Sequence, residues 1–179
     1  MLKVLKFGGS SMADAAQFEK VRSIVTSDES RRVVVVSAAG KRYKDDHKVT
    51  DLLYLCYAHL QYGVSCDGIY QMICDRYLSI RDELGLRTDL EGEFAALRRK
   101  MDQGISRGEY FAAKLMADYL GFDFLDSTMW LKFRLDGSVD QEASYEALQH
   151  AASGRRVVMP GFYGVMPDGA IKTFTRGGS

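Results

Sequence analysis

The first segment that could do chemistry is KFGGSS at residues 6–11, near the start of the chain. A short apolar stretch delivers a lysine, and two glycines then turn the chain toward an expected helix. Glycine lets backbone N–H groups approach a phosphate closely, and a helix N-terminus and a lysine both add positive charge. The candidate phosphate-binding residues are Lys6, Gly8, Gly9 and Ser10. A tight turn with a solvated lysine explains the same residues, and the segment matches neither the GxxxxGK[ST] nor the GxGxxG motif.

A second segment of small residues, SAAG at residues 37–40, follows the apolar run RVVVV at 32–36. In open α/β sheets, ligands bind beyond the carboxyl ends of the strands. If the chain before Gly8 and the run at 32–36 form parallel strands, both glycine segments lie at the same edge. Small residues there leave room for a ligand, although many strand-to-helix loops have this composition.

Two later segments carry charged side chains that could bind a ligand. Ser106-x-x-Glu109 has the spacing of a capping box, in which Ser106 is the N-cap and Glu109 is the N3 residue. Glu109 can alternatively pair with a substrate ammonium at the edge of a site. Arg176 precedes a second diglycine near the end of the chain, and a guanidinium can hold a carboxylate with two parallel hydrogen bonds. A tail without fixed structure is the alternative for that segment.

A sheet is needed to position these segments. The run at 32–36 is typical of a strand buried on both faces, which favours a parallel sheet covered by helices. The periodicity predicts strands at 2–6, 32–36, 122–125, 129–135, 155–159 and 171–175, and helices at 14–26, 50–63, 67–84, 89–101, 106–120 and 141–152. The charged segment between residues 37 and 48 is expected to be a flexible surface loop. This alternation predicts an α/β fold with a mainly parallel sheet.

Composition excludes several classes of protein. The chain has 179 residues, which favours one domain, and its formal net charge of zero argues against a nucleic-acid binder. We expect no membrane association, because no stretch has the roughly 20 apolar residues of a membrane span. The apolar run at the N-terminus is too short and too interrupted for a signal peptide. The cysteines Cys56, Cys66 and Cys74 form no CxxC pair, so we expect reduced thiols in a cytoplasmic protein and no metal site.

The order and spacing of the motifs resemble the N-terminal part of the amino-acid kinase family, and within it the aspartokinases. The motifs are KFGGSS, VVVVSAAG, VTDLL, SRGE, PGFYG and TRGGS, and they extend from Lys6 to Ser179. The resemblance implies a three-layer α/β/α sandwich with a mainly parallel sheet. It also implies transfer of a phosphoryl group from ATP to the side-chain carboxylate of L-aspartate.

The resemblance further implies roles for individual residues. Lys6 matches the lysine that contacts the transferring phosphate, and the glycine loop beside it matches Gly8, Gly9 and Ser10. The residues that match the aspartate pocket are Ser37, Ala38, Thr50, Glu109 for the amino group, Phe162, Arg176 for the carboxylate, and then Gly177, Gly178 and Ser179. ATP and Mg²⁺ are the implied cofactors, with Mg²⁺ bound through phosphate oxygens rather than in a protein cage.

In the family, the RGGS motif is followed by an aspartate, by the rest of the kinase domain and by regulatory ACT domains. We therefore expect residues 1–179 to be the aspartate-binding N-terminal part of a kinase domain, incomplete at its C-terminal side and inactive alone. A homo-oligomer is expected for the full-length protein. The alternatives are a related kinase with another acceptor, and a non-catalytic binding or subunit-assembly module with the same fold.

Overall fold

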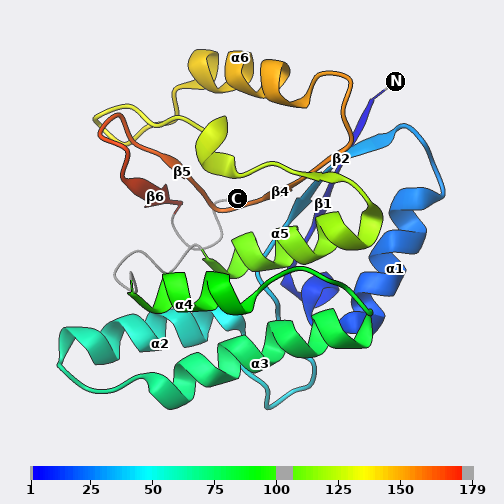
Figure 1. The fold of residues 1–179 in the computed structure, drawn as a ribbon. Coiled ribbons are helices and arrows are strands. Elements are labelled where there is room, and N and C mark those ends of the chain that lie inside the picture. The colour runs from blue at the N-terminus through cyan, green and yellow to red at the C-terminus, as the bar shows by residue number, and fades with distance from the viewer. Residues whose placement is uncertain (1, 100–106, 175–179) are drawn as a thin grey trace.

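The chain folds around a four-stranded sheet whose strands are all parallel, in the order β1-β2-β4-β3 (Figure 1). The computed structural model describes residues 2–99 and 107–174, except for the side chain of Arg99. The elements are β1 (Lys3–Phe7), η1 (Gly9–Met12), α1 (Ala15–Thr26), β2 (Arg31–Val36), α2 (Val49–Gln61), α3 (Asp67–Glu83), α4 (Glu91–Arg99), α5 (Arg107–Leu120), β3 (Asp123–Phe124), η3 (Ser127–Met129), α6 (Gln141–Ala152), β4 (Val157–Pro160), β5 (Tyr163–Val165) and β6 (Ile171–Thr173).

The valine-rich strand β2 lies inside the sheet, between β1 and β4. Its side chains alternate between the faces: Val34 and Val36 enter the larger hydrophobic core, and Val33 packs in a smaller one. Phe7 of β1 and Pro160 of β4 are both in register with Val36 at the end of β2. The carboxyl ends of these three strands therefore meet at one edge, which confirms the predicted parallel sheet.

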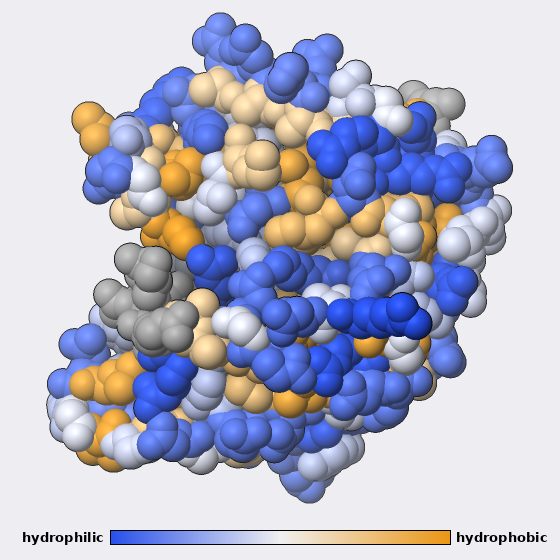
Figure 2. Space-filling view, viewed as in Figure 1, coloured by the Kyte–Doolittle hydropathy of each residue, from blue (hydrophilic) through white to orange (hydrophobic). Residues whose placement is uncertain are grey.

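Helices cover both faces of the sheet, which confirms the three-layer α/β/α architecture. Helix α6 lies over one face, and α1 and α5 lie over the other (Figure 1). Helices α2 and α3 pack against each other and against α5, and α4 places Phe94 against Phe111 of α5. Hydrophilic residues predominate along the outer side of α6, and apolar residues gather beneath it (Figure 2). Helix α5 is thus the buried element that connects the sheet to the outer helices.

One predicted strand, at 129–135, is wrong. Asp126 instead caps the short helix η3 by accepting a hydrogen bond from the N–H of Thr128 at 2.9 Å. The backbone N–H of Lys132 then donates to the side-chain oxygen of Ser144 in α6 at 2.9 Å, so it is not available for a regular ladder. Isolated bridges are the only strand-like pairing of this stretch among the described residues. The structure instead contains a hairpin of β5 and β6. The sequence analysis predicted a strand at the position of β6 but none at that of β5.

The charged segment after β2 also differs from its prediction. Residues 41–45 are exposed as expected, but residues 38–40 are buried, and Asp46 near the C-terminal end of the segment is buried and paired with Arg76 of α3. The interpretation as a flexible loop missed this anchor, because a buried ion pair between distant residues leaves no periodic signal.

The described cysteines are Cys56, Cys66 and Cys74, and all three are buried free thiols. Burial raises the pKa of Cys56 to about 12 and that of Cys74 to about 11, which disfavours the reactive thiolate. Within residues 2–99 and 107–174, no helix is long and apolar enough to cross a membrane. No group of three or more metal-binding side chains is found in that part of the chain either.

Candidate functional site

A cavity of about 560 Å³ lies at the sheet edge where β1 and β2 end. It brings together most of the residues predicted from separate motifs, namely Gly9, Ser10, Ser37, Ala38, Thr50, Glu109 and Phe162. The remaining lining residues are Ala39, Gly40, Lys41, Lys48 and Asp51. Ala39 and Gly40 belong to the SAAG segment that the sequence analysis singled out, whereas it assigned no role to Lys41, Lys48 or Asp51.

The two glycine loops contact each other directly and form one wall of the cavity. The N–H of Gly40 donates a hydrogen bond to the carbonyl oxygen of Gly9 at 2.8 Å, and the N–H of Ser37 donates to that of Phe7 at 3.1 Å. A Cβ atom at Gly40 would lie 2.6 Å from the carbonyl carbon of Gly9. Only glycine fits this approach, so the second glycine segment is required by contact with the first.

Glu109 supplies a buried carboxyl group to the cavity wall. It lies in the first turn of α5 with only 5% of its surface exposed, and its Oε2 atom has no hydrogen-bond partner among the described residues. Burial raises the pKa of Glu109 to about 8, although hydrogen bonds from the backbone N–H groups of Glu109 and Ala38 oppose this shift. An unpartnered buried carboxyl group is costly, and a ligand ammonium would supply the missing partner.

Tyr77 of α3 connects the two elements that flank Glu109. Its hydroxyl donates a hydrogen bond to the carbonyl oxygen of Gly108 at 2.7 Å and accepts one from the N–H of Ala39 at 3.3 Å. Gly108 also approaches Ala38 closely, since a Cβ at Gly108 would lie 2.7 Å from that of Ala38. The sequence analysis missed Tyr77, and the available signal was a tyrosine on the apolar face of α3, where its hydroxyl needs a partner.

Phe162 lines the cavity in a strained backbone conformation. Its φ is 77°, the only positive value at a non-glycine residue in the described part of the chain. This conformation costs a non-glycine residue roughly 1–2 kcal/mol. Two backbone hydrogen bonds hold this conformation. The N–H of Gly161 donates to the carbonyl oxygen of Val36 at 2.9 Å, and the N–H of Phe174 donates to the carbonyl oxygen of Phe162 at 2.8 Å. Such strain concentrates at functional sites, which supports the prediction that Phe162 belongs to the pocket.

Two of the predicted phosphate-binding residues lie beside the cavity rather than in its wall. Lys6 and Gly8 are exposed at the carboxyl end of β1, and neither is among the lining residues. A Cβ at Gly8 would meet nothing within 4 Å, and its φ of −77° is accessible to any residue. The packing of the described residues therefore does not explain why this position is glycine.

The remaining predictions fall outside the described residues. Ser106, the expected N-cap of α5, lies there, and so do Arg176, Gly177, Gly178 and Ser179. The reciprocal capping box and the carboxylate-binding arginine therefore stay predictions.

Comparisons with known proteins agree on one family. A model of the amino acid kinase family matches residues 1–179. Aspartokinase 3 of Bacillus subtilis is 35% identical over 99% of this chain and 44% of its own length. The crystal structure of Clostridium acetobutylicum aspartate kinase superposes with a TM-score of 0.94 at 40% identity, over 98% of this chain and 42% of that one. The chain therefore spans less than half of the length of these relatives.

A more distant structure shows the same fold. E. coli aspartokinase III, solved in complex with aspartate and ADP, gives a TM-score of 0.83 at 22% identity, over 99% of this chain and 44% of that one. At this identity the likeness supports the fold alone.

Proposed function

The chain belongs to the amino-acid kinase family, and from this membership we propose that residues 1–179 are the aspartate-binding part of an aspartate kinase. The observation that carries the proposal is Glu109, a buried carboxyl group with an unpartnered oxygen in a cavity at the strand ends. The names of the B. subtilis and C. acetobutylicum relatives support the choice of L-aspartate as the acceptor.

The proposed chemistry needs positioning more than covalent catalysis. Glu109 binds the α-amino group of L-aspartate, and Arg176 binds its α-carboxylate, so the side-chain carboxylate is left facing the phosphate. One of its oxygens attacks the γ-phosphorus of ATP in line, the bond from that phosphorus to the ADP oxygen breaks, and the products are 4-phospho-L-aspartate and ADP. The nucleophile is already an anion, so holding the reactants together and neutralising charge are the main requirements.

The phosphate side of the site is assigned to Lys6, Gly8, Gly9 and Ser10. Gly8 is exposed, and a Cβ there would meet no atom within 4 Å. We infer that glycine at this position leaves room for a phosphate to approach the backbone, with Lys6 as the neighbouring cation. Mg²⁺ bound through phosphate oxygens would neutralise charge there, a mode of binding that needs few protein ligands.

Ligand titrations test the aspartate site directly. Two-dimensional NMR of the ¹⁵N-labelled chain is recorded with L-aspartate, L-glutamate and N-acetyl-L-aspartate, which lacks the ammonium group. We expect L-aspartate to shift the amide signals of Ala38, Gly40 and Glu109, and N-acetyl-L-aspartate to leave them in place. Equal responses to both compounds would contradict the role of Glu109.

A second experiment tests the reaction. Aspartate-dependent release of ADP is measured on the full-length protein with a panel of acceptors, namely L-aspartate, L-glutamate, N-acetyl-L-glutamate and a nucleoside monophosphate. We expect the highest kcat/KM with L-aspartate. A preference for another acceptor would support a related kinase, and binding of L-aspartate without ADP release would support a non-catalytic module.

A further inference from the structure

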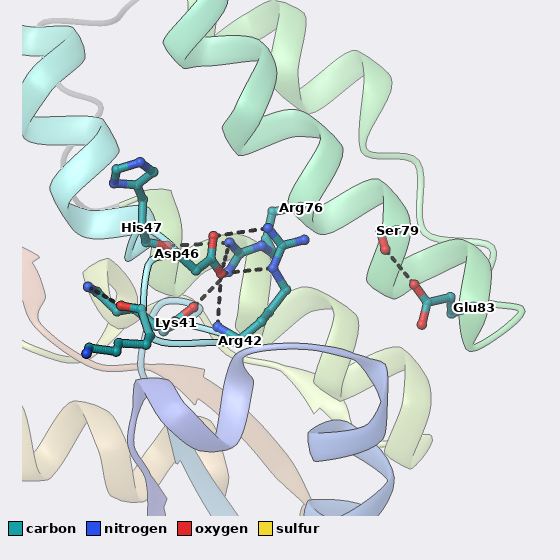
Figure 3. A network of polar contacts seen from close by, with 9 residues as sticks. Lys41, Arg42, Asp46, His47, Arg76, Ser79 and Glu83 are labelled. Atoms are coloured by element: carbon teal, nitrogen blue, oxygen red, sulfur yellow. Dashed lines mark hydrogen bonds and ion pairs between the residues drawn. The ribbon is translucent and has the colours of Figure 1, made fainter.

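Behind the cavity, helix α3 carries a buried arginine that contacts the loop after β2 (Figure 3). Arg76 and Asp46 are each 4% exposed, and the Nη2 atom of Arg76 donates to Oδ2 of Asp46 at 2.6 Å. The Nη1 atom of the same guanidinium donates to the carbonyl oxygen of Gly40 at 2.7 Å. One side chain therefore holds the loop at two points that are six residues apart.

Asp46 is also held from within the loop (Figure 3). The Nε and Nη2 atoms of Arg42 donate to its two carboxylate oxygens at 2.8 and 3.0 Å, and the backbone N–H of Arg42 donates to Oδ2 at 2.9 Å. These hydrogen bonds from Arg42 keep the pKa of Asp46 well below its usual range, so the carboxylate stays charged. The segment from Gly40 to Asp46 is thus a closed loop fastened to α3.

This anchor reaches the cavity through Gly40. The carbonyl of Gly40 accepts from Arg76, and its N–H donates to the carbonyl of Gly9 at 2.8 Å. A guanidinium has donors in a fixed fork and can hold a carbonyl and a carboxylate at once, whereas a lysine ammonium is a single flexible point charge. The loop between the anchor points also supplies Lys41 to the cavity wall.

We propose that Arg76 is a positioning residue for the site: through the carbonyl of Gly40, it fixes the contact between the two glycine loops that form the cavity wall. The identity of the ligand rests on the proposed function, but the position of the loops does not. Arg76 acts from behind the wall, because it is buried and is not among the residues that line the cavity.

The test compares Arg76→Lys with Arg81→Lys. Arg81 lies on the same helix and binds the carboxylate of Glu91, at 2.7 and 2.8 Å, away from the cavity. Hydrogen exchange at the Gly40 amide, measured by NMR on the 179-residue chain, reports the contact between the loops without any ligand. We expect Arg76→Lys to accelerate this exchange at least tenfold and to raise the Kd for L-aspartate at least tenfold, with the global melting transition retained. Arg81→Lys should change neither quantity.

Each outcome decides the proposal. Unchanged exchange at Gly40 in folded Arg76→Lys would overturn it, whatever the affinity for L-aspartate. If the wild-type chain does not bind L-aspartate, the proposed function fails, and exchange at Gly40 still decides the role of Arg76. If Arg76→Lys does not fold, the neutral double variant Arg76→Gln with Asp46→Asn takes its place, because it leaves no buried charge unpaired. Loss of folding in both variants would assign Arg76 to global stability and would also overturn the proposal.

Discussion

The N–H of Gly40 donates a 2.8 Å hydrogen bond to the carbonyl oxygen of Gly9, and this bond joins loops that follow two different strands. Both loops leave the same edge of the sheet, since β1 and β2 are parallel neighbours. The contact leaves no room for a side chain at Gly40. The two loops therefore form one wall of the cavity, and a substitution that moves one loop should also displace the other.

Gly40→Ala tests this contact. The added Cβ would lie 2.6 Å from the carbonyl carbon and oxygen of Gly9, so one of the loops must shift. We expect a loss of stability of about 1–3 kcal/mol, as for overpacking, and a clear rise in the Kd for L-aspartate. Calorimetry of unfolding and of binding measures both. The control is Gly68→Ala in α3, where a Cβ meets nothing within 4 Å and stability should hold or increase. Equal effects of the two substitutions would show that close approach is not the cause.

Tyr77→Phe tests the connection between α5 and the loop after β2. The substitution keeps the ring but removes the hydroxyl that bonds Gly108 and Ala39. The control is Tyr70→Phe on the same helix, which removes a buried hydrogen bond of 2.6 Å to the carbonyl of Phe94. Both should destabilise the protein by about 1–3 kcal/mol, because each leaves a buried group unsatisfied. Only Tyr77→Phe should also weaken L-aspartate binding, which isothermal titration calorimetry can measure.

Glu109→Gln tests the proposed ammonium site. The substitution keeps the size of the side chain and removes its negative charge, so the interaction with a ligand ammonium loses its charge assistance. Hydrogen bonds to charged groups contribute about 1.5–3 kcal/mol, so we expect a Kd for L-aspartate roughly 10- to 100-fold higher. The control is Glu93→Gln, at a partly buried carboxylate that pairs with Lys114 instead. An unchanged Kd in Glu109→Gln would remove Glu109 from the binding site.

The pKa of Glu109 also predicts how stability depends on pH. In the folded protein without ligand this pKa is about 8, against an ordinary value of 4.5. Between these two values the folded state holds one more proton than the unfolded state. The free energy of unfolding should therefore fall as the pH rises, by up to about 1.4 kcal/mol per pH unit from this group. Denaturant unfolding at several pH values should show this slope in the wild type and a smaller one in Glu109→Gln.

Ligand binding should reverse that protonation. An ammonium beside Glu109 favours the carboxylate, so binding of L-aspartate at pH 7 should release a proton. Titration calorimetry in two buffers of different ionisation enthalpy measures the release. Binding without proton release would indicate that Glu109 is already ionised in the free protein.

Lys6→Ala tests the phosphate side of the site. Lys6 is exposed at the end of β1, so its loss should barely change the melting temperature. In the full-length protein kcat should fall at least about a hundredfold, the scale of losing one preorganised transition-state donor. Lys3→Ala on the same strand is the control, since Lys3 pairs with Asp28 at 2.6 Å near the other end of the strand. A variant that unfolds but keeps its specific activity when folded would assign Lys6 to stability instead.

The sequence by itself determined the sheet and most of its helices. The run at 32–36 has the β-branched composition of a strand buried on both faces, and β2 lies inside the sheet with neighbours on each side. The boundaries of α6 match the predicted 141–152 because Asp140 caps its start and the helical periodicity ends at Ala152. These features depend on neighbouring residues in the chain, and local propensity and period can therefore reveal them.

The sequence also identified most of the cavity, because strand ends in a parallel sheet share one edge. Ser37, Thr50 and Glu109 come from different motifs and line the same space. These residues are close because they follow parallel strands or lie at the start of a helix at the same edge of the sheet. The alternation of strands and helices in the sequence already predicts that arrangement.

Only the tertiary structure decided what supports that cavity. Arg76 and Asp46 are 30 residues apart, and Tyr77 and Gly108 are 31 apart, yet each pair is hydrogen-bonded in the interior. No sequence motif marks either pair, because the two residues meet only when α3 packs behind the loop and α5. The failed strand at 129–135 has the same cause, since Ser144 of α6 takes the N–H of Lys132. Local sequence specifies the helices and strands. The hydrogen-bond partners of buried polar groups are specified only by how distant elements pack, because each such group needs a partner in the interior.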